Sequence, residues 1–225
     1  MMINTRSSGI VNNLQDYTFH ILGCGAIGSS AATQLLRCGA KKFVLYDMDK
    51  VATENIGVSQ YMDEHIGMNK TDALEEHLMS INCTGLEILQ VPEYFNMFRY
   101  QNNNDIVILG FDSMKSRKDA VEEICYNKQT KPYLLIDGRM GGEHYQQYLF
   151  KDVTLAKYLK TWYSDKEGDP EPCNIKATTY CSNMAGAMIV NAIRKVVTNS
   201  PYETVLTFNF PTMTIEKNTC FPVWH

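Results

Sequence analysis

The sequence of 225 residues contains no apolar run long enough to cross a membrane, since a transmembrane helix needs about 20 consecutive, predominantly apolar residues. It also lacks an apolar secretion signal near its N-terminus, so we expect a cytoplasmic protein. Neither sign of charge dominates, because 21 lysines and arginines nearly balance 25 aspartates and glutamates, for a formal net charge of -4. Bulk charge therefore gives no reason to expect a nucleic acid or a membrane surface as a partner.

Cysteine pairs with the spacing of metal ligands are also missing. The seven cysteines include no C-x-x-C pair, so we predict no zinc site. An odd number of cysteines fits poorly with a closed set of disulfides, and we expect free thiols in a reducing compartment. The sequence has no internal repeat, and its length suits a single domain over residues 1–225 with one substantial core.

A glycine-rich turn is the most informative feature that is present. A predicted strand over residues 19–22 runs directly into Gly23, Gly25 and Gly28. The first glycine permits a tight turn, the second lets backbone N–H groups approach a phosphate, and the third lets a helix pack closely on the strand. With Ala26 and Ile27 between the glycines, a helix N-terminus, which attracts anions, follows the strand. The turn predicts nucleotide binding without deciding between ATP and a dinucleotide.

Strand and helix patterns alternate along most of the chain. Further strands are predicted over residues 42–47, 86–91, 105–110 and 133–137, and helices after Gly28 and over 67–78 and 114–127. Beyond residue 142 we predict an antiparallel strand near 145–149, a polar crossover segment over 151–180, a buried helix over 180–197 and a hairpin over 205–216. The predicted fold is α/β, with a Rossmann-like, mostly parallel sheet flanked by helices, a C-terminal antiparallel extension and an N-terminal arm over residues 1–16.

Charged residues gather where the predicted strands end. Asp47 closes the second strand about 20 residues after the glycines, from where a carboxylate can bind ribose hydroxyls. Asp112 follows the fourth predicted strand and Asp137 ends the fifth, and the carboxyl ends of parallel strands converge on one crevice. Lys70 lies in the first turns of a predicted helix, where a cation opposes the helix dipole, which is a mild indication that it serves an anion.

Five ordered groups of residues resemble the ThiF/MoeB/HesA family, the adenylating enzymes of the ubiquitin-activating superfamily. They are the glycine turn of residues 23–28, Asp47-Met48-Asp49 followed by Val51 and Asn55, Gly67-Met68-Asn69-Lys70, Ile81-Asn82, and Asp112-Ser113-Met114-Lys115-Ser116-Arg117. The last group is similar to the family's Asp-Asn-x-x-x-Arg. The likeness extends over nearly the entire chain.

The resemblance implies an enzyme that uses ATP and Mg²⁺ to adenylate the C-terminal carboxylate of a ubiquitin-like or sulfur-carrier protein, or of a peptide, and releases pyrophosphate. In this interpretation Asp112 holds Mg²⁺, Lys70 neutralises the phosphates and Asp47 binds the ribose. The resemblance also implies a homodimer. The remaining residues that it implies at the nucleotide site are Asp49, Asn55, Ser113 and Arg117.

The sequence departs from the family in the loop after Asp49. The family has Asn-Leu-x-Arg-Gln there, with an arginine that contacts the phosphates, whereas this chain has Asn55-Ile56-Gly57-Val58-Ser59-Gln60. Two other cations are candidates to replace that arginine. Arg6 in the N-terminal arm would reach the partner's site across a dimer interface, as the family implies, and Arg139 follows the fifth predicted strand.

Two cysteines are candidates to accept an activated acyl group, as some relatives do. Cys173 lies in the polar crossover segment, and Cys181 begins the last predicted helix, where a helix N-terminus would lower its pKa. The alternative for both is a buried structural role, which we also expect for Cys24, Cys38, Cys83 and Cys125.

Two other functions remain open. A nicotinamide-dependent oxidoreductase would explain the glycine turn and Asp47 but would leave Lys70, Asp112 and Arg117 without a role. A catalytically silent adapter, like the inactive halves of heterodimeric activating enzymes, is favoured by the missing loop arginine.

Overall fold

An eight-stranded sheet organises the computed structural model, which describes residues 6–11, 13–100, 103–126, 131–167 and 177–220. The strand order is β3-β2-β1-β4-β5-β6-β7-β8. The first five strands in that order run parallel and the last three pair antiparallel. The bounds are β1 Thr18–Leu22, β2 Lys42–Tyr46, β3 Glu87–Val91, β4 Asp105–Leu109, β5 Leu134–Gly141, β6 His144–Phe150, β7 Tyr202–Asn209 and β8 Thr214–Cys220. This confirms the predicted α/β fold with its antiparallel C-terminal extension.

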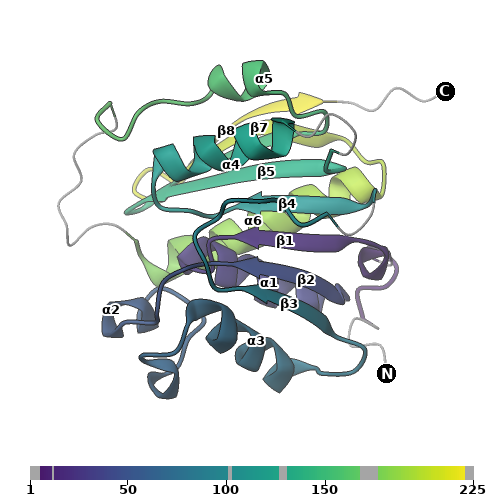
Figure 1. Cartoon of the computed structure of the whole chain (residues 1–225). Helices are drawn as coiled ribbons and strands as arrows, with labels where there is room; N and C mark the ends of the chain where they lie inside the picture. The colour runs from purple at the N-terminus through teal and green to yellow at the C-terminus, as the bar shows by residue number, and fades with distance from the viewer. Residues whose placement is uncertain (1–5, 12, 101–102, 127–130, 168–176, 221–225) are drawn as a thin grey trace.

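Helices cover both faces of the sheet (Figure 1). Helices α1 (Ala26–Arg37), α3 (Lys70–Ile81) and α6 (Thr179–Val197) share one apolar core with the sheet, whereas α4 (Met114–Tyr126) and α5 (Leu155–Leu159) share the other. The short helix α2 (Thr53–Ile56) and the 3-10 turns η1 (Leu14–Asp16) and η2 (Asp63–His65) complete the described helical elements. Both β1 and β4 are buried along their whole length, as expected for central parallel strands with helices on both sides.

The glycine turn adopts the close packing that its sequence predicts. Gly23 has a φ of +93°, and a Cβ there would lie 2.7 Å from the carbonyl carbon of Gly110. A Cβ on Gly28 would lie 1.9 Å from the carbonyl oxygen of Gly23. In contrast, a Cβ on Gly25 would meet nothing within 4 Å. Two of the glycines therefore let β1, β4 and α1 approach one another, and the middle one borders open space.

Several observed boundaries differ from the predicted ones, and α3 extends over Lys70–Ile81 instead of residues 67–78. Strand β5 continues past Asp137 to Gly141, because residues 135–141 pair with β6. The loop after Asp47 contains α2, which begins where Asn55 Oδ1 accepts a hydrogen bond from the backbone N–H of Ala52 at 2.9 Å. The described part of the N-terminal arm packs on the domain, since Val11 and Leu14 are buried in the core.

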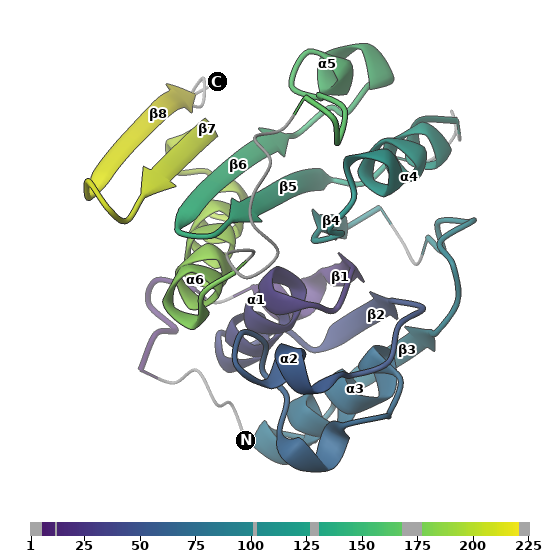
Figure 2. The same ribbon diagram turned by 90° about the vertical axis from the view of Figure 1, so that its left-hand side faces the viewer.

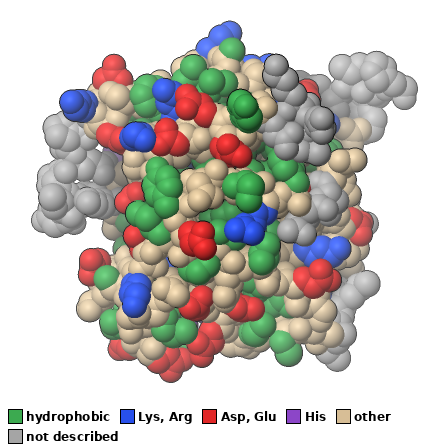
Figure 3. All heavy atoms as spheres, in the orientation of Figure 1, with side chains coloured by type: hydrophobic (Ala, Val, Ile, Leu, Met, Phe, Trp, Pro, Cys, Tyr) green, Lys and Arg blue, Asp and Glu red, His purple; other side chains and the backbone are tan. Residues whose placement is uncertain are grey.

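The surface in Figure 3 carries acidic and basic side chains interspersed with apolar ones. None of the described helices is long and apolar enough to serve as a membrane span.

Helices α1 and α6 cross closely at Gly186. A Cβ at this position would lie 2.3 Å from Ser30 Oγ and 2.9 Å from the Ser30 carbonyl carbon. Gln34 and Ser30 on α1 both contact Asn183 on α6, with 2.9 Å between Gln34 Nε2 and the Asn183 carbonyl oxygen. The two helices therefore approach at a distance that a side chain on Gly186 would prevent.

We expect Gly186→Ala to lower the free energy of unfolding by about 1–3 kcal/mol, because the added methyl group would force the two helices apart. Urea denaturation measures this change. Asn191→Ala, at an exposed position of the same helix, is the control and should change stability little. Since alanine has the higher intrinsic helix propensity, a Gly186→Ala protein as stable as the unchanged one would contradict the close approach.

Candidate active site

A cleft of about 970 Å³ opens at the carboxyl ends of the parallel strands. Figure 2 looks onto this edge, with α2 and the start of α1 on one side and the ends of β4 and β5 on the other. The cleft lining includes these residues predicted for a nucleotide site: Gly23, Gly25, Ala26, Ile27, Asp47, Asp49, Asn55, Lys70, Asp112, Ser113 and Arg117. Gly28 lies beneath the turn, against Gly23. The sequence motifs are thus brought together in one place.

Asp47 holds the backbone of the glycine turn. One carboxylate oxygen accepts a hydrogen bond from the N–H of Cys24 at 2.8 Å, and the other accepts one from the N–H of Asp49 at 2.9 Å. Asp47 is 9% exposed, so these charge-assisted bonds form in a largely dry environment, where they are strong. The contact that the structure shows for Asp47 is therefore with the turn itself, and a bond to ribose remains a prediction.

Lys70 places a positive charge beside this carboxylate. Its Nζ lies 2.8 Å from Asp49 Oδ2 and 4.0 Å from Asp47 Oδ1. Burial by itself lowers the pKa of Lys70, but the carboxylates of Asp47, Asp49 and Asp112 outweigh it and the net shift is upward. The pKa of Asp47 is raised by burial, and Lys70 partly offsets that increase. Lys70 is accordingly a permanent cation at neutral pH, held where the glycine turn meets the cleft.

Tyr61 connects the glycine turn to the start of α3, and the sequence motifs did not indicate it. Its hydroxyl contacts the carbonyl oxygen of Cys24 and lies 3.2 Å from that of Lys70. The side chain is buried and the pKa of its hydroxyl is raised well above the usual value by burial, so it acts as a hydrogen-bond donor. Tyr61 thereby holds the turn and the lysine in one arrangement.

Asp112 is exposed in the cleft just before α4. Mg²⁺ is usually held by one or two carboxylates together with phosphate oxygens and water, and the exposed carboxylate of Asp112 in the cleft lining fits that requirement. The described residues contain no group of three or more His, Cys, Asp or Glu side chains that could hold a metal ion alone. The donor set therefore suits a metal that is shared with a nucleotide.

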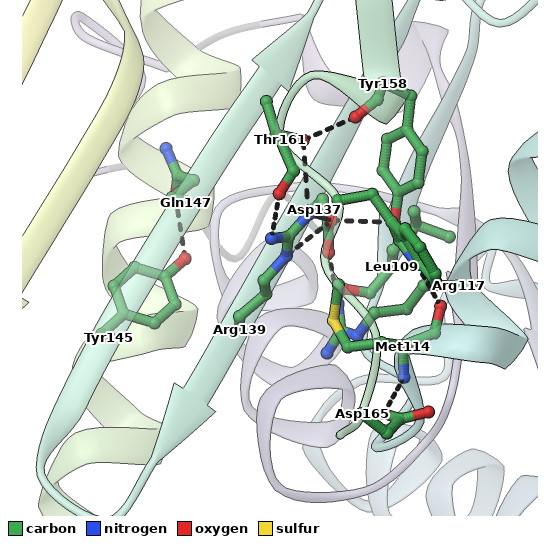
Figure 4. Close-up of polar contacts among 11 residues, drawn as sticks. Leu109, Met114, Arg117, Asp137, Arg139, Tyr145, Gln147, Tyr158, Thr161 and Asp165 are labelled. Atoms are coloured by element: carbon green, nitrogen blue, oxygen red, sulfur yellow. Dashed lines mark hydrogen bonds and ion pairs between the residues drawn. The ribbon is translucent and has the colours of Figure 1, made fainter. Parts of the chain in front are cut away.

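Asp137 lies in a buried cluster instead of at the cleft surface, which corrects its predicted position. Its carboxylate contacts the guanidinium of Arg117, accepts hydrogen bonds from Arg139 Nε and Nη2 at 2.9 and 2.7 Å, and accepts one from the Tyr158 hydroxyl at 3.1 Å (Figure 4). The side chain is fully buried. A buried carboxylate requires such partners, and the continuation of β5 beyond residue 137 encloses it.

The two arginines of this cluster line the cleft while their guanidiniums are engaged. Arg117 Nη1 also donates to the carbonyl oxygen of Leu109 at 3.2 Å. Arg139 donates to the carbonyl oxygen of Thr161 at 2.7 Å and its guanidinium lies over the rings of Tyr148 and Tyr163, 4.5 and 5.3 Å from their centres. Two guanidiniums against one carboxylate give this cluster a net positive charge.

Arg6 does not join the cleft of its own chain. It is exposed, and it is not among the residues that line the cleft. A role for Arg6 at a nucleotide site would therefore require a second copy of the chain.

The cysteine predictions have different outcomes. Cys173 lies outside the described residues. Cys181 is fully buried, and burial together with nearby Glu143 raises its pKa to about 11, so the predicted lowering by the helix N-terminus is wrong. Cys24 is buried as expected, whereas Cys83 is exposed.

We expect iodoacetamide at pH 8 to modify Cys83 well before Cys181, because Cys83 is exposed whereas Cys181 is buried and its pKa is raised. Mass spectrometry of peptides from timed samples measures both rates, and urea-unfolded protein is the control in which the two should react similarly. Equal rates in the folded protein would contradict the burial of Cys181.

Comparisons with known proteins agree with this geometry. A family model described as the ThiF family matches residues 2–222. Among curated relatives, ubiquitin-like modifier-activating enzyme 5 of Oryza sativa is 42% identical over 77 residues, covering 33% of this chain and 18% of the relative. The same enzyme of Rattus norvegicus is 38% identical over 134 residues, covering 52% and 33%. The chain thus spans a third or less of the length of these relatives.

Solved structures share the fold at low identity. E. coli MccB with ATP superposes with a TM-score of 0.69 at 16% identity, covering 95% of this chain and 67% of that one. PaaA superposes with a TM-score of 0.69 at 15% identity, again covering 95% and 67%. Likeness at this level of identity establishes the fold alone.

Proposed function

The chain belongs to the ThiF family, and from this premise we propose that it uses ATP to adenylate the C-terminal carboxylate of a ubiquitin-like protein, a sulfur-carrier protein or a peptide. The observation that carries the proposal is Lys70, held by Asp47 and Asp49 beside the glycine turn and in the same cleft as Asp112. A dinucleotide-binding turn does not require this lysine or Asp112, so the arrangement favours ATP over a nicotinamide cofactor.

The reaction needs little from the protein beyond position and charge. The substrate carboxylate attacks the α-phosphorus of ATP, the bond to pyrophosphate breaks, and an acyl-adenylate and pyrophosphate result. The N–H groups around Gly25 and the N-terminus of α1 bind phosphate oxygens, while Lys70 neutralises the charge that develops on them. Asp112 would hold Mg²⁺, which when bound neutralises the pyrophosphate.

The names of the relatives support the substrate class. Similar proteins include enzymes that activate ubiquitin-like modifiers, and MccB has been solved both with ATP and with MccA. We propose by analogy that the substrate of this chain presents an extended tail ending in a free carboxylate. A homodimer in which Arg6 reaches the partner's cleft belongs to the same proposal, since the loop after Asp49 contains no arginine.

The silent adapter is the second candidate, because that loop lacks its arginine. In favour of the enzyme, Lys70 and Asp112 line the same cleft as the glycine turn, and Arg117 and Arg139 add cations to its lining. An enzyme and a silent adapter would both have the ThiF fold, but only the enzyme would adenylate a substrate.

We expect Lys70→Ala to reduce ATP–pyrophosphate exchange by about 10²–10³-fold, the usual effect of removing one group that stabilises transition-state charge. Asp112→Ala should reduce exchange by a similar factor. The assay uses purified protein with candidate small β-grasp proteins and peptides that end in a free carboxylate. Lys157→Ala, at an exposed position of α5 that does not line the cleft, is the matched control and should exchange normally.

Calorimetry with ATP and with NAD⁺ separates the alternatives. Binding of ATP without any exchange would favour the adapter, and binding of NAD⁺ alone would favour the oxidoreductase.

We further propose that Cys173 takes the acyl group from the adenylate as a thioester, since Cys181 is buried and its pKa is raised. The thiolate attacks the acyl carbon and AMP leaves. Cys173→Ala should retain pyrophosphate exchange while losing the thiol-sensitive adduct with the substrate on non-reducing gels. Cys181→Ala and Cys83→Ala should retain both, and an undiminished adduct in the Cys173→Ala protein would remove this cysteine from the mechanism.

A further inference from the structure

The start of α4 is held by a carboxylate from a distant part of the chain. Asp165, which lies 51 residues beyond Met114 in sequence, accepts hydrogen bonds from the backbone N–H of Met114 at 2.7 Å and of Lys115 at 3.3 Å. Its second oxygen also lies 3.4 Å from the Ser113 hydroxyl. The Met114–Asp165 bond is visible in Figure 4. All three donors follow immediately after Asp112.

The segment that carries Asp165 is itself fixed on two sides. Trp162 donates its indole N–H to the carbonyl oxygen of Met114 at 2.8 Å, so the same residue of α4 is held through both its N–H and its carbonyl group. Arg139 of β5 donates to the carbonyl oxygen of Thr161 at 2.7 Å and stacks on Tyr163. Residues 161–165 therefore connect the end of β5 to the start of α4.

This connection bears on Asp112 because that side chain is exposed in the cleft. Its direction is consequently set by the backbone on either side of it. On the β4 side the backbone is fixed by the sheet, where Gly110 N–H donates to the carbonyl oxygen of Leu22 at 2.7 Å. On the α4 side the backbone is held by the hydrogen bonds that the N–H groups of Met114 and Lys115 donate to Asp165.

We propose that Asp165 is a positioning residue for Asp112: it holds residues 113–115 so that the Asp112 carboxylate points toward the metal and phosphate side of the cleft. The proposal rests on the adenylation proposed above, in which Asp112 serves the metal–nucleotide complex. An acidic residue at a helix N-terminus is common for stability alone. A positioning role differs because it makes Asp165 control the Mg²⁺ requirement.

Hydrogen exchange of the nucleotide-free protein tests the first step. Mass spectrometry that resolves single amides should show faster exchange at Met114 and Lys115 in Asp165→Ala than in the unchanged protein. Asp165→Asn retains an amide oxygen that can accept from Met114 N–H and should remain close to the unchanged protein. Glu167→Gln is the control, because the Glu167 carboxylate binds Ser164 within the same segment. In this variant the amides of Met114 and Lys115 should exchange as in the unchanged protein. Unaltered exchange in Asp165→Ala overturns the proposal.

Calorimetric titration of ATP at a series of Mg²⁺ concentrations tests the second step. Asp165→Ala should need about tenfold more Mg²⁺ for half-maximal ATP binding, the lower end of the usual effect of removing an outer partner of a metal ligand. Asp165→Asn should restore most of this binding. An unchanged Mg²⁺ requirement overturns the proposal, and so does an equal loss in both variants, which would make Asp165 a ligand.

Failure of the proposed function would be recognised separately. An unchanged protein that binds no ATP at any Mg²⁺ concentration would overturn adenylation, and with it the link from Asp165 to the metal. The hydrogen-exchange experiment contains no nucleotide, so it tests whether Asp165 stabilises the start of α4 whether or not the protein binds ATP.

Discussion

The carboxylate of Asp47 is the group on which the site depends. Its two oxygens are committed to backbone N–H groups of the glycine turn and of the loop after β2, and Lys70 lies beside it. A largely buried carboxylate would be costly without such partners, so the turn, the loop and the start of α3 stabilise one another. Asp47 and the glycine turn that it holds both line the cleft.

A second buried carboxylate organises the other side of the cleft with the opposite balance of charge. Asp137 binds two arginines, whereas Lys70 is shared between two aspartates. The β1–β2 side is therefore rich in carboxylates around one lysine, and the β5 side carries an excess guanidinium. Residues 161–165 join this second cluster to the start of α4, next to Asp112.

The pKa values of Cys181 and Lys70 depend on burial and on neighbouring charges more than on their positions at helix N-termini. Cys181 lies in the first turn of α6, where the helix dipole alone would favour a thiolate. The side chain is fully buried, and the cost of placing a charge in an apolar core raises its pKa instead. Lys70 shows the converse case, since burial lowers its pKa but three nearby carboxylates more than compensate.

The βαβ order, the glycine turn and the charged residues at the strand ends could all be predicted from the sequence, because hydrophobic periodicity and glycine positions are local properties of the chain. It could not give the partners of those charges. That Asp137 is buried between Arg117 and Arg139, that Tyr61 joins the turn to α3, and that Asp165 reaches α4 all depend on contacts between segments far apart in sequence. These contacts arise only when the segments pack against one another, because packing sets the burial and the distances on which the strength of each polar contact depends.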